Sequence, residues 1–105
     1  MSKDSNFSNK VYDCVKSIPK GKVTTYGIIA ALSGNPNASR AVGQILHNNP
    51  SPVKIPCHRV VNRDGRLAPS FAFGGQDIQK ILLERENIHV DINNRVNLKK
   101  YGWKL

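Results

Sequence analysis

The stretch Ile55-Pro56-Cys57-His58-Arg59-Val60-Val61 concentrates reactive side chains between conformationally stiff neighbours. Pro56 fixes its own φ and biases the residue before it towards an extended conformation, so the chain approaches Cys57 rigidly. The β-branched pair Val60-Val61 favours a buried strand that leads away from the cysteine. Alone, the stretch allows two interpretations, a small buried cysteine before a strand or a reactive thiol. The remainder of the chain supports the second.

The length and charge of the chain limit what it does. Its 105 residues suffice for a single domain, which we place at 1–105, so one site is expected. Sixteen Lys and Arg against seven Asp and Glu give a net charge of +9. Such an excess is typical of a protein with a polyanionic partner, and nucleic acid is the first candidate. A basic surface that serves only solubility is the alternative.

The two cysteines, Cys14 and Cys57, form neither a CxxC pair nor a repeated spacing. They therefore predict neither a disulfide framework nor a zinc site, and we expect no metal and no cofactor. The polar first residues and the lack of a long apolar run predict a soluble protein without a secretory signal or membrane span. We expect a cytoplasmic location, associated with the nucleoid if the protein is bacterial.

The spacing of apolar residues predicts mainly helices in the first half of the chain. Positions three and four apart indicate a helix over about 7–18, on whose apolar face Cys14 lies. Thr24 or Thr25 can cap a short helix over 26–32, and a tight turn at 33–36 leads to a second helix over about 37–48. Two short helices joined in this way are typical of a helix-turn-helix.

The second half of the chain combines a loop, a helix and a hairpin. The loop over 67–75 could fold over a pocket or anchor its phenylalanines in the core. A helix over about 76–87 is predicted with Ile78, Ile81 and Leu82 on its inner face. Residues 88–92 and 95–98 alternate as two strands across an Asn-Asn turn, with His89 facing solvent. A basic tail with two aromatic residues, over about 99–105, is expected either to dock on this hairpin or to touch DNA.

The outer face of the 37–48 helix suits DNA. Asn37, Arg40, Gln44 and His47 recur at spacings of three and four, and little acidic charge lies nearby. Gly43 lies within the helix, where it costs about 1 kcal/mol relative to alanine and would allow close approach to another backbone. Arg40 stands near the start of a helix in the recognition position, which favours DNA binding over an ordinary solvated arginine.

Four motifs in unbroken order carry a family resemblance: Gly21-Lys22-Val23-Thr24-Thr25-Tyr26, the 34–43 segment GNPNASRAVG, Asn49-Pro50, and the 55–61 stretch. Together they resemble the C-terminal DNA-binding domain of O6-alkylguanine-DNA alkyltransferases. The resemblance implies an α+β, mainly helical fold, a winged helix-turn-helix that binds the minor groove. It also implies that the damaged guanine is flipped out of the stack, because its O6 substituent is inaccessible while the base is paired.

The resemblance also implies roles for individual residues. Arg40 would enter the base stack in place of the flipped nucleotide, and Tyr26 would lie by the phosphate 3′ to the lesion. Asn49 would brace the turn between the two halves of the site. The main chain of Cys57 and Val60 would accept from the guanine amino group. Two larger sets follow: a DNA-binding set of Arg40, Tyr26, Asn37, Ser39 and Gln44, and a lesion pocket of Cys57, Val60, Phe73 and Gly74.

Cys57 is the expected alkyl acceptor. A thiol is mostly protonated at neutral pH, and the thiolate is the nucleophile, so a base is required. His58 is the candidate base; neighbours on a helical turn do not face each other, which favours a bridging water over direct contact. The resemblance implies that a glutamate holds this histidine, and by position it is Glu86. Arg59 is expected to be structural.

Two features separate this chain from the typical alkyltransferase. We expect only the C-terminal domain of the family here, and Ala72-Phe73-Gly74-Gly75 stands where the family has a Tyr-Ser-Gly-Gly type loop. The longer loop and the 101–105 ending resemble the alkyltransferase-like proteins, which bind alkylated guanine without repairing it and flag it for excision repair. Those proteins typically carry tryptophan or alanine in place of the cysteine.

Three hypotheses therefore stand. The first is a single-turnover methylated-DNA–protein-cysteine S-methyltransferase that acts as a monomer on duplex DNA containing O6-alkylguanine. The second is a damage sensor that binds the same lesion without transfer and recruits excision-repair proteins. The third, a winged-helix regulator that reads undamaged sequence, gives no reason for the Pro-Cys-His-Arg element.

Overall fold

The computed structural model describes residues 3–69 and 71–105; Met1, Ser2 and Ser70, which fall within the predicted domain and loop, lie outside the described residues. Its elements follow in the order α1 (Lys3–Lys16), β1 (Thr24–Thr25), α2 (Tyr26–Leu32), α3 (Ser39–His47), the 3-10 helix η1 (Cys57–Arg59), β2 (Val60–Val61), α4 (Gly75–Glu84) and α5 (Leu98–Tyr101). The predicted α+β, mainly helical fold is confirmed. No helix in the described part of the chain is both long and apolar enough to cross a membrane.

The helix-turn-helix forms as its sequence predicts. Thr25 caps α2, because its hydroxyl accepts from the backbone N–H of Ile28 at 3.3 Å. α3 begins at Ser39, later than predicted, because the Asn35 side chain and carbonyl accept from Asn37 and Ala38 and extend the turn. α2 and α3 pack together and against α1.

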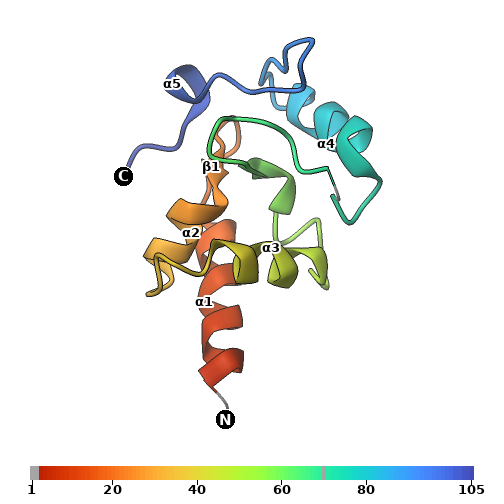
Figure 1. The fold of residues 1–105 in the computed structure, drawn as a ribbon. Helices are drawn as coiled ribbons and strands as arrows, with labels where there is room; N and C mark the ends of the chain where they lie inside the picture. The colour runs from red at the N-terminus through yellow and green to blue at the C-terminus, as the bar shows by residue number, and fades with distance from the viewer. Residues whose placement is uncertain (1–2, 70) are drawn as a thin grey trace.

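The elements form two layers with the Pro-Cys-His-Arg segment between them. Figure 1 shows α1, α2 and α3 in the lower layer, α4 and α5 in the upper one, and η1 and β2 in green between them. β2 pairs in parallel with β1, with Thr24 opposite Val60 and Thr25 opposite Val61. Because side chains alternate across a strand, Val60 packs into the core of the lower layer and Val61 into that of the upper layer.

The predicted inner face of the fourth helix is correct for Leu82, which packs against the lower core, and wrong for Ile78 and Ile81. α4 buries Gln79 and Leu83 completely, whereas Ile78 and Ile81 are 37% and 44% exposed. Gln79 lies inward because three buried backbone groups hydrogen bond to its amide. α4 also begins at Gly75, directly after Gly74, whose φ of +125° and close approach to the Ile78 side chain exclude a larger residue.

The predicted terminal hairpin forms only in part. The chain reverses as predicted, with an antiparallel bridge between Val90 and Val96 and another between Arg95 and Arg66, but the two strands do not form. The Asp91 carboxylate accepts from the N–H groups of Asn93 and Arg95, which closes a tight turn. Asn97 then caps α5, so part of the expected strand and tail is helical. Hydrogen bonds to the side chains of Asp91 and Asn97 thus take the place of the backbone hydrogen bonds that would join two strands. His89 is exposed, as predicted.

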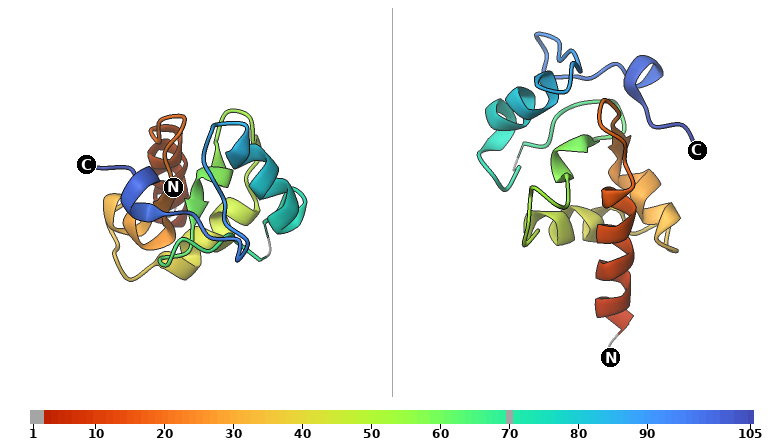
Figure 2. Two further views of the ribbon diagram at one scale, coloured as in Figure 1. Left: turned by 90° about the horizontal axis from the view of Figure 1, so that it is seen from above. Right: turned by 180° about the vertical axis from the view of Figure 1, so that it is seen from behind.

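The C-terminal segment docks on the start of β1. Val23 donates to the Tyr101 carbonyl at 2.9 Å, and Trp103 donates to the Val23 carbonyl at 2.7 Å. The Trp103 side chain packs against the lower core. Figure 2 shows the blue segment returning beside the β1 region in both views. The tail therefore holds the two layers together.

Candidate functional site

Cys57 is the first residue of η1 and is 6% exposed. Its backbone N–H donates to the Ile55 carbonyl at 2.7 Å, a tight turn that follows from the Pro56 ring. The Asn49 side chain fixes the same carbonyl by donating to it at 2.8 Å, and its amide oxygen accepts from Ser51 at 2.9 Å. Asn49 thus bridges the end of α3 and the cysteine turn.

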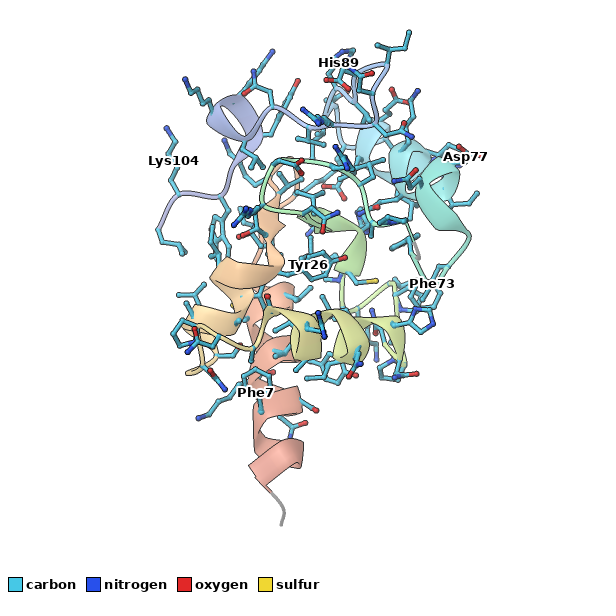
Figure 3. All side chains as sticks on the ribbon, in the orientation of Figure 1. Phe7, Tyr26, Phe73, Asp77, His89 and Lys104 are labelled. Atoms are coloured by element: carbon cyan, nitrogen blue, oxygen red, sulfur yellow. The ribbon has the colours of Figure 1, made fainter. Side chains whose placement is uncertain are left out.

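A cavity of about 940 Å³ opens between α3 and the cysteine turn. One wall comes from α3 and includes Ser39, Arg40, Gly43 and Gln44. The opposite wall comes from η1 and the loop after β2 and includes Cys57, Ala68, Phe71 and Ala72. Tyr26 lines the cavity from α2, and Figure 3 shows its side chain near the centre of the molecule. The thiol and the helix-turn-helix therefore share one cavity.

A second cavity of about 430 Å³ adjoins the first. Cys57 and Phe71 line both cavities. Phe73 lines this smaller cavity, on the side of the molecule where Figure 3 also shows α4. Val60 is completely buried, and neither it nor Gly74 is among the described residues that line the two cavities. In the longer loop, Phe71 and Ala72 thus occupy the wall where the sequence placed Phe73 and Gly74.

Behind Cys57, His58 belongs to a network centred on Glu86. Nε2 of His58 lies 2.6 Å from the Glu86 carboxylate, and Nε of Arg59 donates to both of its oxygens at 2.9 and 3.0 Å. The N–H of Gly21 donates to the same carboxylate at 2.9 Å. Arg59 also donates to the Ile18 carbonyl at 2.8 Å. The network joins α1, η1 and the end of α4.

The protonation states in this network follow from burial and charge. Burial acts to raise the pKa of the Glu86 carboxyl, but the donors Arg59, Gly21 and His58 together hold it below its ordinary value. Burial lowers the pKa of His58, although Glu86 opposes this effect. The ring is therefore neutral at pH 7, and an ionised carboxylate at Nε2 requires the proton there. Nδ1 is left with the lone pair that a base needs.

Two phenols share the surroundings of Cys57. Burial, with the Cys57 charge as a smaller cause, raises the pKa of Tyr26 to about 12. The same causes raise the pKa of Tyr12, whose hydroxyl donates to the Ile45 carbonyl at 3.1 Å. Burial also raises the pKa of the Cys57 thiol, while hydrogen bonds to Asn49 and the backbone act against it. At rest the thiol is protonated, so its reaction requires a base.

The predicted DNA-binding residues lie together on the open side of the large cavity. Ser39, Arg40 and Gln44 are exposed on α3 and line it, and Asn37 is exposed just before the helix. Arg63, for which the sequence contained no signal, also lines the cavity, after β2. Arginines from two separate segments therefore line the cavity, which favours an acidic ligand.

Residues 6–88 match the family described as "6-O-methylguanine DNA methyltransferase, DNA binding domain". The chain belongs to this family. The match includes the helix-turn-helix, the Pro-Cys-His-Arg segment and Glu86, which is the part of the chain that builds the cavity. The predicted family membership is thereby confirmed.

Within the family, the chain matches some relatives almost end to end. Alkyltransferase-like protein 1 of Schizosaccharomyces pombe is 38% identical over 102 residues, which cover 93% of this chain and 94% of that protein. The crystal structure of S. pombe Atl1 in complex with damaged DNA containing O6-carboxymethylguanine superposes with a TM-score of 0.88 and 38% identity, covering 100% of both chains.

Other family members match over a smaller share of their length. The DNA base-flipping protein of Escherichia coli K12 is 38% identical over 105 residues, 98% of this chain and 78% of its own. The methylated-DNA–protein-cysteine methyltransferase of Rattus norvegicus is 40% identical over 85 residues, 81% of this chain and 40% of its own. This chain thus combines the length of the alkyltransferase-like members with a cysteine at position 57.

Two parts of this family site could not be located by motif. Gln79 is completely buried and donates to the backbone carbonyls of His58 and Val60, which follow the cysteine, but an apolar pattern for α4 predicts it to face outwards. The signal that points to it is its position four residues before Leu83, on the face that the helix buries. Arg63 follows β2 in a turn segment, where no spacing rule relates it to α3.

Proposed function

We propose that this protein is a DNA repair protein that binds O6-alkylguanine in duplex DNA and transfers the alkyl group to Cys57. The observation that carries the proposal is that Cys57 lines the same cavity as Arg40 and Tyr26. A base can reach a buried thiol only after leaving the stack, and the cavity offers it a space bounded by the helix that docks on DNA. The net charge of +9 favours the approach to the phosphates.

In the docked complex, α3 would lie in the minor groove, with Asn37, Ser39 and Gln44 at the backbone and Arg40 in the base stack. Insertion of a side chain offsets the lost stacking and keeps the nucleotide outside the helix. Tyr26 retains its proton far above neutral pH, since its pKa is raised to about 12, so its hydroxyl can donate to the lesion nucleotide. The main chain of Cys57 and Val60 would accept from the guanine amino group.

Transfer would then proceed by displacement at the alkyl carbon. His58 accepts the thiol proton at Nδ1 through a bridging water, while Glu86 holds the ring and stabilises the imidazolium. The Cys57 sulfur forms a bond to the alkyl carbon, and the bond between that carbon and O6 breaks. The electron pair passes to the guanine, which recovers one proton from the imidazolium through the same water. The products are intact guanine and a thioether, so each molecule reacts once.

A second candidate function is lesion binding without transfer, followed by recruitment of excision-repair proteins. The observation that favours it is the end-to-end likeness to alkyltransferase-like protein 1 of S. pombe. In that case the same monomer, docked by the same face, would protect the lesion, and Cys57 would be idle.

Mass spectrometry separates the two candidates. The protein is incubated with a duplex containing one O6-methylguanine, and its intact mass and the Cys57 peptide are measured, with Cys57→Ala as the control. Transfer predicts one added methyl on that peptide and none in the control. If the protein binds the lesion selectively yet gains no mass, the transfer proposal is wrong and the sensor remains.

A further inference from the structure

Gln79 is a completely buried polar side chain between the site and α4. Its Nε2 donates to the carbonyls of His58 and Val60, each at 3.1 Å. Its Oε1 accepts from the N–H of Ala68 at 2.9 Å. One amide group thus connects the backbone that follows Cys57 to the loop that shares its cavity wall.

We propose that Gln79 is a positioning residue for both halves of the reaction: its donors set the cysteine turn for alkyl transfer, and its acceptor sets the loop for lesion binding. The inference rests on the function proposed above. Because the two sets of bonds leave from different ends of the amide, the two effects are separable by substitution. Gln79 touches neither substrate nor the reacting sulfur.

The donor end acts on the backbone that directs Cys57 and His58. The carbonyls of His58 and Val60 lie after the cysteine in η1 and at the start of β2, so pinning both fixes how the 3-10 turn passes into the strand. The Val60 carbonyl belongs to a completely buried residue, and Gln79 is its hydrogen-bond donor there. Without Gln79, both buried carbonyls lose a partner and the turn is free to shift.

The acceptor end acts on the cavity wall. Ala68 lines the large cavity and precedes Phe71 and Ala72, which line it too. The Ala68 N–H is held by Gln79, and the Leu67 carbonyl beside it accepts from Gln76 at 3.0 Å. The first turns of α4 therefore set where this loop begins, and hence the width of the space that receives the base.

Two substitutions test the two ends of the amide, with Leu83→Ala as the matched control. Gln79→Met keeps the length of the side chain and removes all three hydrogen bonds. Gln79→Lys keeps a donor for the two carbonyls and removes the acceptor. Leu83 is also completely buried on α4, but its truncation costs packing without removing a hydrogen bond. For each variant we measure the single-turnover rate at saturating O6-methylguanine duplex, the affinity for lesion over undamaged duplex, and thermal unfolding.

We expect Gln79→Met to lower the transfer rate at least tenfold and to lose lesion selectivity, while Leu83→Ala changes neither when assayed below its unfolding temperature. Gln79→Lys should restore the rate to within a few-fold of wild type but not the affinity. If Gln79→Met does not fold, Gln79→Lys alone tests the proposal, because it should keep a nearly wild-type transfer rate and lose lesion affinity.

Three outcomes would overturn the inference. One is a transfer rate for Gln79→Met equal to that of Leu83→Ala, because the role would then be structural. Another is a Gln79→Lys protein in which rate and affinity fall together. If the wild-type protein does not transfer, the proposed function fails separately; equal lesion selectivity in Gln79→Met and Leu83→Ala would then overturn the role of Gln79 as well.

Discussion

The two walls of the large cavity differ in how exposed their polar side chains are. The α3 wall presents exposed polar side chains, Arg40 and Gln44 among them, which point away from the core. The cysteine wall stands on the network behind it, where the side chains of His58 and Glu86 are only 13% and 9% exposed. The α3 wall is suited to bind a charged partner through exposed side chains. The cysteine wall instead depends on side chains that are already fixed by hydrogen bonds inside the protein.

This difference indicates what each wall tolerates. A charged surface binds phosphate from many positions, so losing one of its side chains weakens binding without disturbing the fold. A buried carboxylate that serves three donors has no such freedom, because each donor left without it becomes a buried unpaired group. Substitutions behind the thiol should therefore affect stability and chemistry together, and substitutions on α3 should affect binding alone.

The largest effect is expected for Glu86→Gln. The change removes the charge that pairs with Arg59 and replaces one of the two acceptor oxygens with an NH2 donor, so His58 and Arg59 lose the ionised carboxylate they share. We expect the free energy of unfolding to fall by about 2–4 kcal/mol and transfer to slow by roughly 10²-fold or more, measured by chemical denaturation and a quenched single-turnover assay. Glu84→Gln, an exposed change at the last residue of α4 and two residues before Glu86, is the control. Equal behaviour of the two variants would contradict the role of the network.

Arg40→Ala is expected to act on binding alone. The side chain is exposed at the mouth of the cavity, and its loss should weaken binding to the lesion duplex by roughly tenfold, about 1.4 kcal/mol. Fluorescence anisotropy at fixed salt measures the affinity, and the unfolding midpoint should not move. Arg85→Ala removes the same charge from an exposed site outside both cavities. If both variants bind equally, Arg40 contributes only general charge.

The pH dependence of stability reports on His58. Burial lowers its pKa below the ordinary value of 6.5, so between the two values the unfolded chain binds more protons than the folded protein. Stability should therefore decrease as the pH falls from neutral through the ordinary pKa of 6.5 towards the lowered pKa of the folded protein. The lowered pKa of Glu86 extends the loss below its ordinary value of 4.5. Denaturant midpoints across this range test the prediction.

The control for the pH series is a pair of histidine variants. His58→Gln should flatten the curve above about pH 5, because the titrating group is removed. His89→Gln should leave the curve as it is, since that residue is exposed. If the stability curve flattens in the His89 variant instead, the pH dependence does not arise from His58.

The smallest effect is expected for Gly43→Ala. This change should raise the stability of the protein and weaken its binding to the lesion. A Cβ at this position would lie 4.0 Å from the Tyr26 ring, an ordinary van der Waals contact, so α3 should gain up to about 1 kcal/mol of stability. Because Gly43 lines the cavity, the added methyl should also weaken lesion binding several-fold. Thermal unfolding and anisotropy of the same sample test both. A more stable protein with unchanged affinity would show that this surface does not approach DNA closely.

The sequence predicted most reliably where local chemistry decides the outcome. Thr25 caps α2 as expected, and the Pro56 ring produces the tight turn into Cys57. It was wrong about most of the buried face of α4 and about the two strands over 88–98. There, long-range hydrogen bonds to Gln79 turn a polar residue inwards, and side-chain caps at Asp91 and Asn97 replace a strand ladder. A periodicity rule assumes that polar side chains seek water, which is untrue of a side chain whose partners lie in the core.

By itself, the sequence determined the helix-turn-helix, the rigid approach to Cys57 and the basic face of α3, because each depends on neighbours within a few residues or on net charge. Only the tertiary structure decided which wall Cys57 faces, which nitrogen of His58 Glu86 engages, and that Phe71 rather than Phe73 lines the large cavity. Those outcomes depend on where segments tens of residues apart come to rest. Burial and partner geometry, which no local pattern contains, set the chemistry there.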